Sequence, residues 1–187
     1  YDAAKQTYTL NLSQRTAPTP GQPDKQAMVM PIRFGLIGPN GAPSAWSSVA
    51  GADIRDDLIV LDKDSATVTF TGVANRPVPS LFRNFSAPVK IVSNATHEDR
   101  LFLARHDSDP FNRWQSLQDV ATTLLVDALK GRDWAAADVK SLAAALQDTV
   151  TSDALDPAFK ALALSLPPES LVARALGKDV DPDRVRA

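Results

Sequence analysis

Proline and glycine are unevenly distributed along this chain of 187 residues, and their distribution restricts the fold more than any motif does. Fourteen of them lie between Pro18 and Pro79, whereas the 108 residues that follow Pro79 contain only eight. The alanine-rich segments all lie after residue 95. This change is typical of a β region with many turns that is followed by a helical region. The sequence therefore predicts a β domain over residues 1–94 and a helical domain over residues 95–187.

Alternation of apolar and polar residues predicts strands in the first region. It is clearest over Thr7–Ser13 and over Met28–Leu36. Pro31 lies on the other face of the second strand and has no N–H for the ladder, so we expect this strand to be an edge strand or to be bulged there. Leu58–Leu61 and Thr67–Thr71 are predicted to pair with each other around the turn that separates them.

Further turns and strands complete the predicted β domain. Gly38–Gly41 is predicted to be a turn, because Asn and Gly tolerate positive φ. Leu81–Val92 is predicted to supply one or two more strands, interrupted by Pro88. About six short strands separated by turns indicate an immunoglobulin-like β-sandwich. The expected fold class is thus mainly β in the first region of the chain, followed by α-helices in the second.

The helical region is punctuated three times by aspartate followed by proline, at Asp109, Asp156 and Asp181. An aspartate oxygen satisfies an N–H of the first helical turn, and a proline at the first position lacks the donor that would otherwise be unsatisfied. Gly131 and Gly177 are predicted to end helices. We expect the short helices to stack antiparallel as a bundle or a superhelix. We also expect this domain to be incomplete, and both ends of the chain to lie inside a longer protein.

Composition excludes several classes of protein. The formal charge of −2 argues against a nucleic-acid-binding protein with a basic surface. The chain has no cysteine, which excludes disulfides, zinc–thiolate sites and cysteine nucleophiles. No apolar run is long enough to span a membrane, and no signal peptide is visible. We therefore expect no nucleic-acid partner and no membrane partner.

His97 and Glu98 begin like the zinc-binding helix HExxH. That motif places two histidines four residues apart, so that both imidazoles reach one metal from one face of a helix. The position four residues after His97 is Leu101, and His106 is too far along the chain to share that turn. We interpret the pair as surface residues in the first turn of a short helix over 97–106.

His106, Asp107, Ser108 and Asp109 include the residue types of a hydrolytic triad. Adjacent residues rarely point at one another, and triads are assembled from separate segments. The two aspartates also suggest calcium, but Pro110 follows them and the later loop ligands are missing. Capping explains Asp109, and we expect a structural role for His106, such as a hydrogen bond at the corner between the domains.

Other carboxylates and loops carry weaker signals. Asp56–Asp57 and the pair Asp62 and Asp64 lie in turns, where acids usually solvate a loop or protect a sheet edge. Catalysis by paired carboxylates needs a cleft and a raised pKa, and neither can be inferred from these positions. Gly38–Gly41 lacks the lysine and the following helix of a phosphate-binding loop.

Arg100, Arg105, Arg113 and Trp114 raise the possibility of stacking with nucleic acid. We favour a solvated face with salt links, because acids are interleaved with these residues: Glu98, Asp99, Asp107 and Asp109. No residue of this chain is predicted to be catalytic, to bind a metal or to bind a cofactor.

Several segments together resemble the β-sandwich domain and the following helical domain of the bacterial aminopeptidase N family. Their order and spacing match over about residues 1–125, and the segments are Tyr8–Leu10, Ser13–Thr16, Lys25–Gln26, Pro77–Leu81, Phe85–Lys90, Arg105–Asp107, Asp109, Phe111, Arg113 and Trp114. The resemblance implies a structural junction between the two domains at five residues, which are His106, Asp109, Phe111, Arg113 and Trp114.

The resemblance also implies a function for the longer protein. Members of this family are zinc-dependent metallo-aminopeptidases that remove N-terminal amino acids from peptides. Their zinc ligands and their motif for the substrate amine lie in a catalytic domain, and neither motif occurs in this sequence. The resemblance therefore implies a non-catalytic scaffold without a cofactor of its own, in a cytoplasmic zinc enzyme that acts on peptides. Its expected partners are the catalytic domain and the remaining C-terminal helices of the same chain.

Two other hypotheses belong to different classes. The first is a stand-alone interaction module, in which the Met28–Leu36 strand is the edge offered to a protein partner. An HExxH motif encoded upstream of Tyr1 would favour the aminopeptidase over this module. The second is a small hydrolase built on His106 and a nearby acid.

Overall fold

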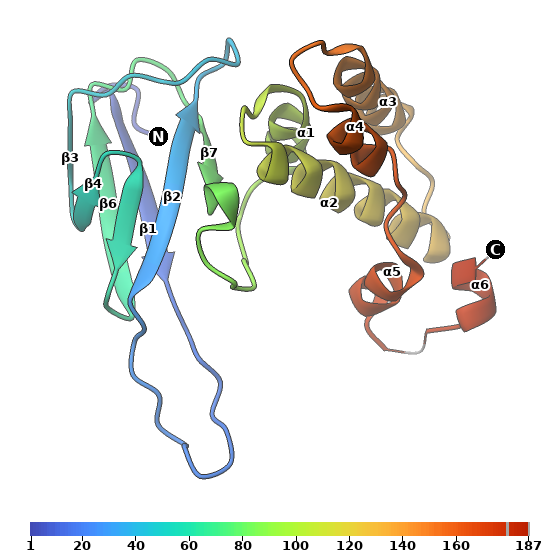
Figure 1. Cartoon of the computed structure of the whole chain (residues 1–187), viewed down its shortest axis with the longest axis horizontal. Helices are drawn as coiled ribbons and strands as arrows, with labels where there is room; N and C mark the ends of the chain where they lie inside the picture. The colour runs from blue at the N-terminus through green and yellow to red at the C-terminus, as the bar shows by residue number, and fades with distance from the viewer. Residues whose placement is uncertain (179, 187) are drawn as a thin grey trace. The chain divides into compact units, whose positions relative to one another are not determined.

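The computed structural model describes residues 1–178 and 180–186, which divide into two compact units (Figure 1). The first unit ends at Val92 and the second begins at Ser93. Within the described residues, seven strands form the first unit and six α-helices form the second. None of these helices combines the length and the apolar character needed to cross a membrane.

The first unit is a sandwich of two antiparallel sheets, as predicted (Figure 1). The three-stranded sheet has the order β1 (Thr7–Ser13), β6 (Ser65–Thr71), β3 (Ser48–Ala50). The four-stranded sheet has the order β4 (Asp53–Arg55), β5 (Leu58–Leu61), β2 (Met30–Ile37), β7 (Val78–Leu81). The inward side chains of both sheets form one core, which includes Leu10, Ile32, Phe34, Leu36, Ile59, Leu61, Val68 and Phe70.

An aromatic cluster fills the centre of the sandwich. Phe34 of β2 lies with its ring centroid 5.4 Å from that of Phe70 of β6, which belongs to the opposite sheet. Trp46 completes the cluster, 5.8 Å from Phe34 and 5.4 Å from Phe70. Aromatic pairs at these distances stabilise a core beyond the effect of area burial alone. The cluster therefore ties the two sheets together.

The predicted pairing of Leu58–Leu61 with Thr67–Thr71 is wrong. β5 pairs with β4 and β2, whereas β6 pairs with β1 and β3 in the other sheet. The connection from Asp62 to Asp64 thus crosses from one sheet to the other. Packed sheets lie about 10 Å apart, a distance that a three-residue connection can span. Alternation along each strand identifies its inward face, but it does not say which sheet the strand joins.

The prediction that the Met28–Leu36 strand is an edge strand or is bulged at Pro31 is also wrong. β2 begins at Met30 and lies inside the four-stranded sheet, and its register with β5 passes Pro31 without an extra residue. The Phe34 N–H donates to the Asp57 carbonyl at 2.7 Å, so alternate N–H groups of β2 point toward β5. The N–H of Arg33 points away and donates to Ser86 Oγ at 3.0 Å. Pro31 has the same orientation as Arg33, and at this level no strand lies beside it, since β7 pairs with β2 only from Phe34 onward. This local gap accommodates the proline.

The segment predicted as strand over Leu81–Val92 differs as well. β7 ends at Leu81, and a 3-10 helix, η1 (Arg83–Phe85), follows it. Phe82, Asn84 and Phe85 have φ values of 58°, 53° and 53°, which are incompatible with an extended strand. Three strands were not predicted. β7 overlaps the predicted segment only at Leu81, and β3 and β4 have only three residues each, too few to show alternation.

The second unit contains α1 (His97–His106), α2 (Pro110–Leu129), α3 (Ala136–Thr151), α4 (Pro157–Ala163), α5 (Glu169–Leu176) and α6 (Pro182–Arg186). All three predicted caps are confirmed: Asp109, Asp156 and Asp181 accept hydrogen bonds from N–H groups at the start of α2, α4 and α6. α2 is central, since it contacts α1, α3, α4 and α5. The buried core contains one residue from each of four helices, three alanines and a leucine, namely Ala104, Leu117, Ala145 and Ala163.

Candidate functional site

The five residues of the predicted junction lie at one corner of the helical unit, where α1 ends and α2 begins; we call this region the α1–α2 corner. Asp107 caps the end of α1, and one of its carboxylate oxygens accepts the Asp109 N–H at 2.9 Å. Asp109 in turn accepts the Asn112 N–H at 2.9 Å. Both aspartates are buried. They hold the turn between the helices, which is a structural use of residues that resemble a triad in the sequence.

Arg113 connects the α1–α2 corner to α3. Its Nη2 donates to Thr149 Oγ1 at 3.2 Å, and the Thr149 hydroxyl donates to the Ala145 carbonyl at 2.8 Å. Burial lowers the pKa of the Arg113 guanidinium, while the charges of Asp148 and Asp107 oppose that shift. A buried cation needs such compensation, because its desolvation is unfavourable. Arg113 therefore depends on groups from both its own corner and α3.

The aromatic residues of the α1–α2 corner form two ring contacts. His106 lies with its ring centroid 4.7 Å from that of Phe102, one turn earlier in α1. Phe111 and Trp114 lie 5.9 Å apart in the first turns of α2. The Trp114 indole N–H is buried and has no acceptor within the described residues. Packing against Phe102 is thus the contact that the described part of the chain gives His106, and a hydrogen bond at the corner between the domains stays a prediction.

The pKa of His106 predicts how the stability of the helical unit changes with pH. Burial, and then the charges of Arg105 and Arg113, lower its pKa, whereas Asp148 raises it. The unfolded chain therefore takes up this proton first, as pH falls through about 6.5. We expect the free energy of unfolding of the helical unit to decrease from pH 7 downward until the folded protein is protonated too. The effect is small, since His106 is only partly desolvated and much of the residue is still in contact with water, which screens its charge.

The measurement is urea unfolding followed by circular dichroism at 222 nm between pH 5 and pH 8. The control is His106→Gln, which cannot titrate. We expect the stability of the parent chain relative to this variant to decline below about pH 6.5. A difference that stays constant over this range would contradict the prediction.

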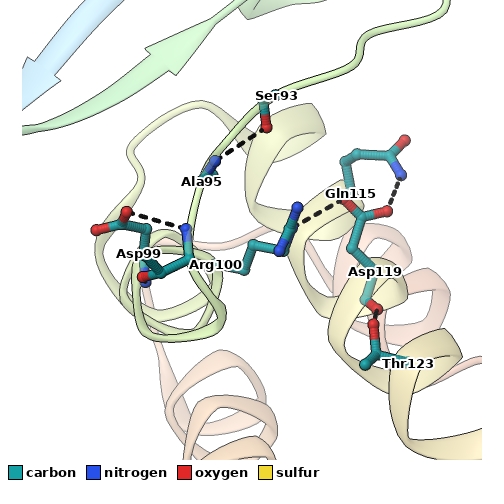
Figure 2. A network of polar contacts seen from close by, with 8 residues as sticks. Ser93, Ala95, Asp99, Arg100, Gln115, Asp119 and Thr123 are labelled. Atoms are coloured by element: carbon teal, nitrogen blue, oxygen red, sulfur yellow. Dashed lines mark hydrogen bonds and ion pairs between the residues drawn. The ribbon is translucent and has the colours of Figure 1, made fainter. Parts of the chain in front are cut away.

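A second polar network links α1 to α2 through Asp119. Figure 2 shows Arg100 of α1 beside this carboxylate, with Nε 3.9 Å from Oδ2. Gln115 donates to the other carboxylate oxygen at 2.8 Å, and the Thr123 hydroxyl donates to the Asp119 carbonyl at 2.8 Å. Burial raises the pKa of Asp119, although Gln115 and Arg100 lower it. A raised pKa is also common at catalytic acids, but burial and an ion pair account for it here.

Arg100 and Arg105 form salt links as predicted, with acids outside the interleaved set, whereas Arg113 is buried and does not lie on a solvated face. Arg100 approaches Asp119 of α2, and Arg105 donates from Nε to Asp148 of α3 at 2.8 Å. Among the interleaved acids, Asp99 forms the capping box of α1 with Thr96, and Asp107 helps to compensate the charge of Arg113. Asp119, Asp148 and Thr149 were missed, because no local pattern connects a residue with a partner 19 to 43 positions away.

The remaining candidates lie apart from one another. His97 Nε2 is 3.4 Å from Asp138 Oδ1 of α3, and Asp57 forms an ion pair with Arg33 at 3.0 Å. Asp62 and Asp64 lie in the connection between β5 and β6. Asn40 accepts the Ala42 N–H at 3.1 Å, which confirms the predicted turn. Across residues 1–178 and 180–186, no group of three or more histidine, cysteine, aspartate or glutamate side chains is placed to hold a metal ion.

Comparison with protein families finds a matching family for each half of the chain. Residues 1–94 match a family described as a domain of unknown function (DUF3458) with an Ig-like fold. Residues 97–187 match the family DUF3458_C, described as ARM repeats. The two matches agree with the observed sandwich and helices.

Three similar proteins bear the name Aminopeptidase N. The protein from Caulobacter vibrioides is 39% identical over 120 residues, which cover 64% of this chain and 14% of that protein. The proteins from Haemophilus influenzae and Escherichia coli are 31% and 29% identical, over 100% and 89% of this chain and 21% and 19% of their own length. The chain thus spans about a fifth of these relatives or less.

A solved structure shares the fold. The crystal structure of Legionella pneumophila aminopeptidase A in complex with aspartic acid superposes with a TM-score of 0.74 at 21% identity. The superposition covers 99% of this chain and 19% of that protein. At this identity the similarity concerns the fold.

Proposed function

The chain belongs to the DUF3458 family, and on this basis we propose that it is the non-catalytic scaffold of a zinc-dependent aminopeptidase that removes N-terminal amino acids from peptides. One observation carries the proposal: an Ig-like domain and an ARM-repeat domain follow each other in a chain whose relatives are named Aminopeptidase N. These relatives are about five times as long as this chain. We therefore propose that the catalytic domain lies in the part of the longer protein that this chain does not cover.

The residues of this chain do not fit a zinc ion. A catalytic zinc site needs three protein ligands from histidine, cysteine or carboxylate side chains, and an open position. The chain has no cysteine and only two histidines, and the described residues contain no suitable cluster. We therefore assign zinc to the catalytic domain of the longer protein, and derive no step through the metal for this chain.

The proposed role of this chain is to hold other parts of the enzyme. We propose that residues 1–94 form one domain and residues 95–187 the beginning of the next. The sandwich would bridge the catalytic domain to the helical domain, through a junction at His106, Asp109, Phe111, Arg113 and Trp114. The helical domain would restrict entry to peptides, which helps to exclude water from the reacting centre. We also propose a cytoplasmic protein, which the lack of cysteine supports.

Activity of the chain alone tests this proposal. We expect this chain, with added zinc, to leave an aminoacyl chromogenic substrate unchanged, whereas the full-length protein hydrolyses it. The same assay on the full-length protein after removal of the metal should show loss of activity, and zinc should restore it. Turnover by this chain comparable to that of the full-length protein would contradict the scaffold role.

A further inference from the structure

β1 is an edge strand without the usual protection against pairing with another strand. Natural sheets protect their edges with short strands, charges, prolines or bulges. The other three edges follow this rule: β3 and β4 have three residues each, β4 carries Asp53 and Arg55, and β7 has four residues including Pro79. β1 has seven residues, without a charge or a proline, and its register with β6 runs from Thr7 to Ser13 without a bulge.

The open side of β1 presents a regular set of backbone groups. The Gln14 N–H donates to the Asp64 carbonyl at 2.8 Å, so the even-numbered residues of β1 are hydrogen-bonded to β6. The odd-numbered residues therefore point their N–H and C=O groups outward. Thr7 uses both of these groups in a bridge to Asp2.

The outward groups of Thr9, Asn11 and Ser13 remain available. No backbone group of residues 1–178 or 180–186 bonds them. Three consecutive outward positions are enough to align an extended segment of about five residues. The open part of the edge therefore runs from Thr9 to Ser13.

We propose that this edge of β1 binds an extended segment from another part of the longer polypeptide, which adds a fourth strand to the three-stranded sheet. Tyr8 and Leu12 are half-buried at the rim of the core, and alternate side chains of an added strand would cover them. The segment should therefore alternate between apolar side chains over the core and polar side chains outside. Strand addition of this kind uses backbone bonds for affinity and side chains for specificity.

The length of the relatives argues for an occupant from the same polypeptide. About four fifths of the Haemophilus influenzae and Escherichia coli proteins lie outside the region that this chain covers. Such a segment is tethered, so its effective concentration at the edge is high. The inference requires a longer polypeptide, but it does not require the proposed peptidase activity.

Hydrogen exchange with residue resolution tests the proposal, in this chain and in the full-length protein. In this chain, we expect the amides of Thr9, Asn11 and Ser13 to exchange at least about 100-fold faster than the paired amides of Leu10 and Leu12. In the full-length protein, we expect the outward amides to become about as slow as the paired ones. The paired amides serve as internal controls.

The variant Asn11→Pro removes one outward N–H and leaves the backbone bonds to β6 in place, since proline is tolerated where the N–H faces away from the ladder. It also removes the side-chain oxygen that accepts the Thr67 hydroxyl of β6. In the full-length variant, we expect Thr9 and Ser13 to exchange at least 10-fold faster than in the parent protein. The matched variant Leu10→Pro removes a bond to β6 instead and should speed exchange across the whole sandwich.

Two outcomes would overturn the proposal. Fast exchange of the outward amides in the full-length protein would show that the edge is open there. Protection in this chain alone, increasing with protein concentration, would show that a second copy is the occupant. Both measurements are independent of peptide hydrolysis. A negative result would therefore overturn the proposed strand addition without bearing on the proposed aminopeptidase function.

Discussion

Replacing Phe34 with alanine is expected to lower the free energy of unfolding of the sandwich by about 3–5 kcal/mol. The Phe34 side chain is 1% exposed and contacts Phe70 and Trp46, so its truncation leaves a cavity between the two sheets. A loss of this size is a large part of the stability of a small domain. Amide NMR spectra in increasing urea should show the strand signals of the variant disappearing first, with the helical signals less affected.

Phe85→Ala is the matched control, because the Phe85 side chain is 57% exposed and lies outside the core. We expect its effect to stay within about 0.5 kcal/mol. Equal losses for the two variants would contradict the assignment of the core. Under the proposed scaffold role, Phe34→Ala should also lower the temperature at which the full-length protein is inactivated, because an unfolded sandwich could not hold the domains that we propose it connects.

Replacing Asp107 with alanine should have the largest effect in the helical unit, about 1–3 kcal/mol. The Asp107 side chain is 2% exposed, accepts the Asp109 N–H and helps to compensate the charge of Arg113. Its loss leaves a buried N–H without this acceptor and a buried cation with less compensation. Urea unfolding followed at 222 nm measures the change, since this signal comes mainly from the helices.

Two further variants test why the loss of Asp107 destabilises the helical unit. Asp107→Asn keeps a side-chain oxygen for the Asp109 N–H and removes the charge, so we expect an intermediate loss. Asp127→Ala removes one partner of a surface pair with Arg132 and should change stability by less than about 1 kcal/mol. If Asp127→Ala and Asp107→Ala destabilised the protein equally, the α1–α2 corner would not be the stabilising feature that we describe.

The sequence predicted individual elements well, because their signals are local. Alternation identified β1 and β6, and an aspartate before a proline marked the start of α2, α4 and α6. An N-cap bonds N–H groups two or three residues away, so the pattern and the structure share the same short segment. The strands β3 and β4 were missed because three residues cannot display a period of two.

The candidate site was predicted only in part. Capping by Asp109 follows from its neighbours along the chain, and the structure confirms it. The partners of Arg113 and Arg105 lie in α3, at Thr149 and Asp148, and no spacing in the sequence indicates them. Their positions depend on how α1, α2 and α3 pack, which in turn depends on the small buried residues between these helices.

The sequence alone determined the longer strands β1, β2 and β6, the starts of α2, α4 and α6, and the side chains of these strands that face the core, because these properties depend on neighbours within a few residues. Tertiary structure alone decided that β5 and β6 belong to different sheets, that Pro31 lies beside a gap, and that β1 is the exposed edge. These properties depend on which strands pair across long stretches of chain. Strand pairing is selected by the total free energy of burial and hydrogen bonding over the whole domain. This total cannot be read from a pattern of neighbouring residues.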